Sequence, residues 1–153
     1  MIVLQSVLEE AITIEMDLLI EDLINKHIEL GQKATGKWIE SLSYEIRGTT
    51  AYVFGADYTQ FLTDGRSGGS RPPISPLELW VKAKLKKSGK EARSIAFAVA
   101  KKIEKEGTSW HPDGSDLISS VITEERKNQI IENISEYLAV RVSKDLEEEI
   151  LKM

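Results

Sequence analysis

The sequence predicts an α+β fold in which a small antiparallel sheet packs against helices, with long helices at the N- and C-terminal ends. Apolar residues recur at helical spacing near both ends, and between them hydrophobic and polar residues alternate as in strands. The length of 153 residues suits one domain with one core. We therefore expect residues 1–153 to form a single domain, with an N-terminal helix over 1–31, an α+β core over 34–122 and a C-terminal helix over 123–153.

The first helix is predicted from about Leu4 to Leu30, because its apolar residues follow one another at steps of three and four. Gly31 comes next and is a suitable residue to end a helix. His27 falls on the same row as these apolar residues, so we interpret it as a packed structural side chain rather than a ligand. The row comprises Ile12, Met16, Leu19, Leu23 and Leu30.

A β-hairpin is predicted after the first helix. Leu42, Tyr44 and Ile46 alternate with polar residues, and the apolar pattern resumes at 52–54 after a polar RGTT segment. Aromatic and β-branched residues favour strands here, although residues 37–41 could instead form a helical turn.

Residues 63–73, TDGRSGGSRPP, predict a surface loop, because they include three glycines and two prolines but no apolar side chain able to join a core. The loop is longer than most connections, and long loops often carry contacts with partners. Its glycines and arginines also resemble an anion cradle, but the Gly-Lys-Ser/Thr ending of a phosphate-binding loop is missing. The candidate partner contacts are this loop and two nearby tryptophans: Asp64, Gly65, Arg66, Gly68, Gly69, Arg71, Pro72, Pro73, Trp80 and Trp110.

Three further helices are predicted after the loop. Ser75, Pro76 and Glu78 form the pattern of a capping box with proline at the first helical position, and that helix should end near residues 88–89. A second helix should run from about Lys90 to residue 106, with an apolar stripe on one face and lysines on the other. The last helix, from residue 123 to the end, is long enough to pack against another chain; its predicted apolar row is Ile131, Ile134, Leu138, Val142, Leu146 and Ile150.

Charge is unevenly distributed along the chain. Residues 66–105 hold eleven Lys and Arg against three Glu, a net charge of +8, whereas the whole chain carries −5. The basic and acidic segments could form solvated helix faces whose opposite charges meet within one fold, or their opposite charges could align neighbouring copies in a ring. A third interpretation, nucleic-acid binding through the basic segment 82–105, conflicts with the overall acidity of the protein.

No pattern of catalytic residues is present. The chain has no cysteine, and its two histidines, His27 and His111, are not beside a nucleophile motif. The loop at 108–116 has His111 with two aspartates, but one short loop provides too few fixed metal ligands. We therefore expect no enzyme activity, no metal and no cofactor. Neither an export signal nor a membrane span is predicted.

The middle of the chain resembles the tail-completion, or minor tail, family of long-tailed bacteriophages, which also includes head–tail joining proteins. The resemblance covers about residues 35–108. It rests on the order of four segments: TGKWIESL (35–42), FGADYTQFLTDGR (54–66), RPPISPLELWVKAKL (71–85) and ARSIAFAVAKKIEKEGT (92–108). The long C-terminal helix departs from the family pattern, because many relatives end soon after the Gly-Thr that here is 107–108.

The resemblance implies a small non-catalytic subunit that assembles as a ring at the head–tail junction. Its expected partners are further copies of itself, in sixfold or twelvefold symmetry, and the neighbouring connector and tail-tube proteins, with a passing contact to genome DNA and none to a membrane. Its expected location is the virion, after assembly in the host cytoplasm. The alternative function is a nucleic-acid-binding or regulatory module that uses residues 82–105.

Overall fold

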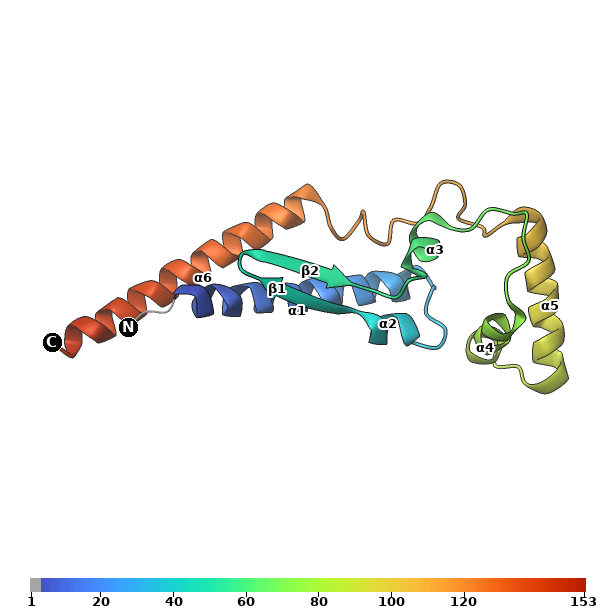
Figure 1. Ribbon diagram of the computed structural model, residues 1–153, viewed down its shortest axis with the longest axis horizontal. Coiled ribbons are helices and arrows are strands. Elements are labelled where there is room, and N and C mark those ends of the chain that lie inside the picture. Colours follow the sequence, from blue (N-terminus) through green and yellow to red (C-terminus); the bar gives the residue numbers. More distant parts are fainter. Residues whose placement is uncertain (1–3) are drawn as a thin grey trace.

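The computed structural model describes residues 4–153 and has the expected α+β architecture, with long helices at both ends (Figure 1). A two-stranded antiparallel sheet is the only sheet in that part of the chain. The elements in chain order are α1 (Leu4–Glu29), α2 (Lys37–Ser41), β1 (Ser43–Arg47), β2 (Thr50–Phe54), α3 (Thr59–Asp64), α4 (Ile74–Leu85), α5 (Gly89–Glu106) and α6 (Glu124–Leu151).

Helix α1 is the central element of the fold. Its apolar face packs against the hairpin and against the first half of α6, which runs antiparallel to it (Figure 1). Polar pairs follow the same antiparallel alignment: Arg126 contacts Asp22, and Arg141 contacts Glu10, both at about 3 Å. His27 is buried at the end of this face, as its position in the helical row predicted.

The hairpin is confirmed, but its strands are placed differently from the prediction. The turn consists of Gly48 and Thr49 alone, so β2 already begins at Thr50. In this register Ala51 and Val53 face α1, whereas two aromatic residues of β2 remain on the solvent side. The residues 37–41, for which we left a helical turn open, form α2.

Buried side chains gather in three clusters, where we expected one core. The first lies between α1, the hairpin and α6, and the second joins Leu23 of α1 to Trp38 and Leu117. The third lies between α4 and α5, where the buried alanines of α5 allow the two helices to approach closely. The α4–α5 pair lies at one end of the molecule, beside the rest of the fold (Figure 1).

The predicted capping box at the start of α4 is wrong. The helix begins two residues earlier, at Ile74, with Pro73 at its N-cap and no side-chain cap bond. Ser75 therefore lies inside the first turn, and Glu78 contacts Lys82 and Arg93 instead of closing a capping box. Neither Pro73 at the N-cap nor Pro76 in the first turn costs a helical hydrogen bond, because the first N–H groups of a helix have no internal partner.

Helix α6 begins where predicted, with the Thr123 hydroxyl accepting a hydrogen bond from the Arg126 N–H at 3.0 Å. The predicted apolar row is only partly covered: Ile134 packs on α1, but Ile131 and Ile150 are more than 60% exposed. The helix has no fully buried residue. Like the other helices of residues 4–153, it is not long and apolar enough to cross a membrane.

Candidate partner-binding surfaces

The glycine-rich loop that follows α3 is attached to the C-terminal end of α5. Arg66 donates its N–H to the Thr108 hydroxyl and accepts the Thr108 N–H, both at 2.8 Å. Gly69 donates to the Glu104 carbonyl at 2.7 Å, and the Arg71 guanidinium contacts the Glu104 carboxylate at 2.8 Å. The loop has no apolar side chain able to join a core, but it is held against α5 because its backbone and arginines supply the contacts instead.

Glycines make this attachment sterically possible. A Cβ on Gly65 would lie 2.7 Å from the Thr108 hydroxyl, and one on Gly68 would lie 2.8 Å from the Lys105 carbonyl. On the opposite side, Gly107 has a φ of +77°, and a Cβ there would collide with the Arg66 carbonyl. Two chain segments therefore touch backbone to backbone, which a side chain at any of these positions would prevent.

The predicted contact residues do not form one surface. Three of the ten, Asp64, Gly65 and Arg66, line a cleft of about 980 Å³ between the loop and the turn at 111–115. Pro72 is buried, Pro73 caps α4, and Trp110 donates its indole N–H to the Phe61 carbonyl at 2.8 Å. Trp110 therefore contacts α3, whereas Trp80 lines a different cleft. The described residues contain no group of three His, Asp or Glu side chains suited to a metal ion.

A second cleft, of about 450 Å³, lies where α4 meets the rest of the fold. Trp38, Tyr58 and Trp80 give it aromatic walls, and Leu79 is 48% exposed at its edge. We call it the aromatic cleft; it is lined by His27, Gln32, Ala34, Thr35, Gly36, Lys37, Trp38, Tyr58, Leu62, Pro76, Leu79 and Trp80. Its floor contains the paired rings of His27 and Trp38, whose centroids are 4.5 Å apart.

Positive charge surrounds the aromatic cleft. Its lining includes Lys37 and no acidic residue. Burial lowers the pKa of His27 below its usual 6.5; a hydrogen bond from its Nδ1 to the Gln32 side-chain oxygen opposes this shift, and the positive charges of Lys33 and Lys84 add to it. Any group that enters the cleft therefore meets apolar rings, a neutral imidazole and nearby ammonium groups.

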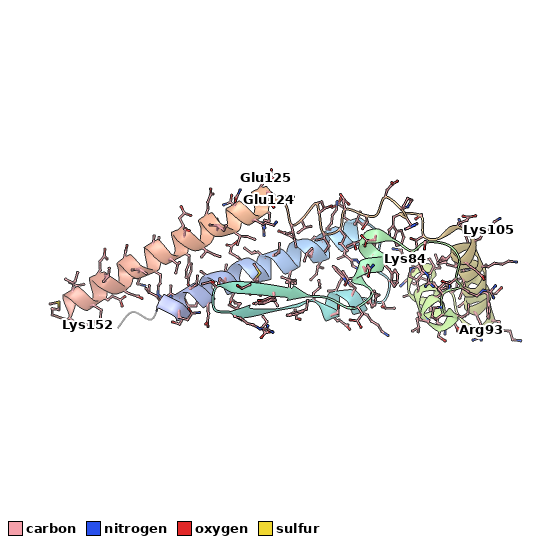
Figure 2. All side chains as sticks on the ribbon, turned by 45° about the horizontal axis from the view of Figure 1, so that its top comes forward. Lys84, Arg93, Lys105, Glu124, Glu125 and Lys152 are labelled. Atoms are coloured by element: carbon pink, nitrogen blue, oxygen red, sulfur yellow. The ribbon has the colours of Figure 1, made fainter. Side chains whose placement is uncertain are left out.

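The solvent-facing side of α5 is basic. Lys90, Arg93, Lys101 and Lys105 share this side with Phe97, which is 44% exposed and lies 5.6 Å from the Arg93 guanidinium carbon. We call these five residues the basic face. Arg93 and Lys105 lie at the outer edge of the α4–α5 pair (Figure 2).

The opposite end of the molecule is acidic. Helix α1 contains seven acidic residues and one lysine, and α6 contains eight acidic and four basic residues. Helices α4 and α5 together with their connection contain nine basic and four acidic residues. Because α1 and α6 extend away from the α4–α5 pair (Figure 1), the charge asymmetry of the sequence becomes a separation of charge along the long axis.

The end of α6 is exposed, and two residues of the predicted apolar row, Leu146 and Ile150, lie on it. Leu146, Ile150 and Leu151 are 48%, 64% and 86% exposed, and Glu147 lies beside them on the same side of the helix. We call these four residues the α6 tip. In the sequence, the sign of such a tip is the apolar row beside three consecutive glutamates at 147–149. The pattern alone could not show that the fold leaves this row uncovered.

The chain matches no known family model, no curated protein and no solved structure.

Proposed function

We propose that this protein is a non-catalytic structural subunit of a bacteriophage particle, placed at the head–tail junction as part of a ring that joins the connector to the tail. The observation that carries the proposal is the separation of charge between the basic α4–α5 pair and the acidic α1 and α6. The order of motifs in residues 35–108, which resembles the tail-completion family, gives the proposal its biological setting.

A ring of identical subunits needs two unlike surfaces on each copy, because every contact is made between different faces. Opposite charge on those faces favours the correct pairing and disfavours contacts between like ends. The elongated subunit has such unlike ends, and its loops and helix ends leave aromatic and aliphatic side chains exposed for a neighbour.

The partners proposed for this ring are further copies of the chain, in sixfold or twelvefold symmetry, the connector protein on one side and the tail-tube protein on the other. The location that follows is the virion, with assembly in the host cytoplasm.

Cryo-EM of purified particles, together with antibody labelling of this protein, tests the proposal. Density that fits α1, α6 and the α4–α5 pair, confined to the head–tail junction, is the expected result and would also give the symmetry. Finished particles without the protein would contradict the proposal.

A second candidate function is nucleic-acid binding through the basic face. The specific observation in its favour is an exposed aromatic ring, Phe97, among cationic side chains, because such an arrangement can stack a base while the cations contact phosphates. Fluorescence anisotropy with labelled DNA, measured over a range of salt concentrations, tests it. Affinity that falls steeply with salt and is weakened by Lys101→Gln would favour this function, whereas no binding at low salt would exclude it.

A further inference from the structure

We infer that the α6 tip of one copy docks into the aromatic cleft of the next copy, so that the protein associates head to tail. This inference rests on the proposed function, since it names the contact that would build the ring.

The two surfaces match in apolar character. The α6 tip presents Leu146 and Ile150 one helical turn apart, the spacing with which an amphipathic helix inserts side chains into a groove. The aromatic cleft has a volume of about 450 Å³ and is lined by Tyr58, which is 42% exposed, by Trp80 and, deeper, by the buried Trp38. Exposed aliphatic side chains on one copy would leave water for aromatic walls on another, which is the main favourable term in such contacts.

The two surfaces also match in charge. Glu147 belongs to the α6 tip and Glu148 follows it, both exposed. The cleft has Lys37 in its lining and Lys33 and Lys84 near His27, with no acidic side chain in its lining. The C-terminal end of a helix also carries a partial negative charge, which adds to the attraction toward ammonium groups. A basic or neutral partner would lose this complementarity.

The contact must be made between copies. The C-terminal end of α6 and helix α4, which lines the cleft, lie at opposite ends of the molecule (Figure 1), so a tip cannot reach the cleft of its own chain. A contact between unlike ends joins copies in one direction and closes as a ring when the rotation between neighbours permits.

Charge reversal in the purified full-length chain tests the inference, with self-association measured by sedimentation velocity over a concentration series. Glu147→Lys with Glu148→Lys, and separately Lys33→Glu with Lys37→Glu, should each weaken association at least about tenfold. The control variants change charge equally at exposed positions outside both surfaces: Glu132→Lys with Glu136→Lys on α6, and Arg47→Glu on β1 with Lys127→Glu on α6. They should weaken association much less than the tip and cleft variants do.

Complementation gives the decisive result. A chain that carries all four reversals, two in the tip and two in the cleft, should regain association, as should an equimolar mixture of the two reversed variants, because opposite charges then face each other again. Association that the tip and cleft reversals leave unchanged, or no recovery in the mixture, would overturn the inference.

The apolar part has its own test. Ile150→Ser with Leu151→Ser should weaken association, whereas Ile131→Ser with Val140→Ser, which are 62% and 70% exposed on the same helix, should not. A wild-type chain that stays monomeric at its highest soluble concentration would also overturn the inference. If particles carry the protein at the junction and the tip variants still assemble normally, the proposed function stands and this contact is rejected. If the chain self-associates through this contact but is absent from particles, the contact stands and the proposed function is rejected.

Discussion

The Lys84 ammonium group donates a hydrogen bond to the Gly31 carbonyl oxygen at 2.6 Å and lies 3.3 Å from the Lys33 carbonyl oxygen. Lys84 belongs to α4, and Gly31 follows the last turn of α1, so this side chain joins the α4–α5 pair to the central helix. A cation here also stabilises the end of α1, where carbonyl groups lack helical partners. Lys84 lies on the inner side of the α4–α5 pair (Figure 2).

Replacing Lys84 by methionine should loosen the α4–α5 pair and leave the remaining fold intact. Methionine keeps the aliphatic stem but cannot donate to the two carbonyls, and an exposed contact of this kind contributes at most about 1 kcal/mol to stability. We expect faster amide hydrogen exchange in α4 and α5 with little change in α1. Lys82→Met, which removes a cation that pairs with Glu78 inside α4, is the control. Equal exchange rates in the two variants would contradict the joining role of Lys84.

Alanine at Gly107 should destabilise the attachment between the loop and α5. The residue has positive φ and is buried against the Arg66 backbone, so alanine adds both backbone strain and a collision. Gly48→Ala is the matched control, because Gly48 has a φ of +62° but open space around a Cβ. We expect urea unfolding to show a loss of about 1–3 kcal/mol at Gly48 from strain alone and a larger loss at Gly107. Equal losses of stability in the two variants would show that the close approach of the two segments adds no destabilisation at Gly107.

Stability should fall as the pH is lowered through the range just below 6.5, because of His27. Burial lowers its pKa in the fold, so the unfolded chain takes up the proton first and gains free energy relative to the native state. The contribution is complete above pH 6.5 and is lost as the pH falls toward the lowered pKa. Urea unfolding at pH 7.5 and pH 5.5 should show a smaller pH dependence for His27→Gln than for the wild type. His111→Gln changes the other histidine, which is exposed, and should retain the dependence of the wild type.

Truncation of the core should act locally in one cluster and widely in another. Val81 and Leu117 are both fully buried, but Val81 belongs to the separate cluster of α4 and α5, whereas Leu117 packs with Leu23 and Trp38. Leu117→Ala should cost about 2–5 kcal/mol and lower the stability of the whole fold. Val81→Ala should mainly increase hydrogen exchange in α4 and α5. An equal increase in exchange in α1 and α6 would show instead that the clusters unfold as one unit.

Much of the secondary structure could be predicted from the sequence. The helical rows of α1 and α5 and the alternation at Tyr44 and Ile46 are local patterns, and local patterns follow from the geometry of helices and strands. The glycine stops at 31 and 107 are local as well, since both lie at positive φ, where glycine has no steric penalty. The start of α4 was misplaced because Ser75 fits two positions of a helix start, and only the surrounding contacts select one.

The candidate site was less predictable. The predicted loop 63–73 is a distinct segment except that Thr63 and Asp64 belong to the end of α3. Its attachment to α5 depends on Thr108 and Glu104, which are more than thirty residues away in the chain. Trp80 was grouped with that loop because it is close in sequence, whereas its side chain lines the aromatic cleft with Trp38 and Tyr58.

The sequence by itself therefore determined the longer helices, the presence of a hairpin and the concentration of positive charge in 66–105, because each is a property of neighbouring residues. The tertiary structure decided which apolar residues are covered, how Lys33 and Lys37 come to surround the same cleft as Trp80, and that the acidic and basic segments lie at opposite ends. These relationships depend on the path of the chain through α1, α4 and α6, and side chains distant in sequence meet only when the backbone between them has folded.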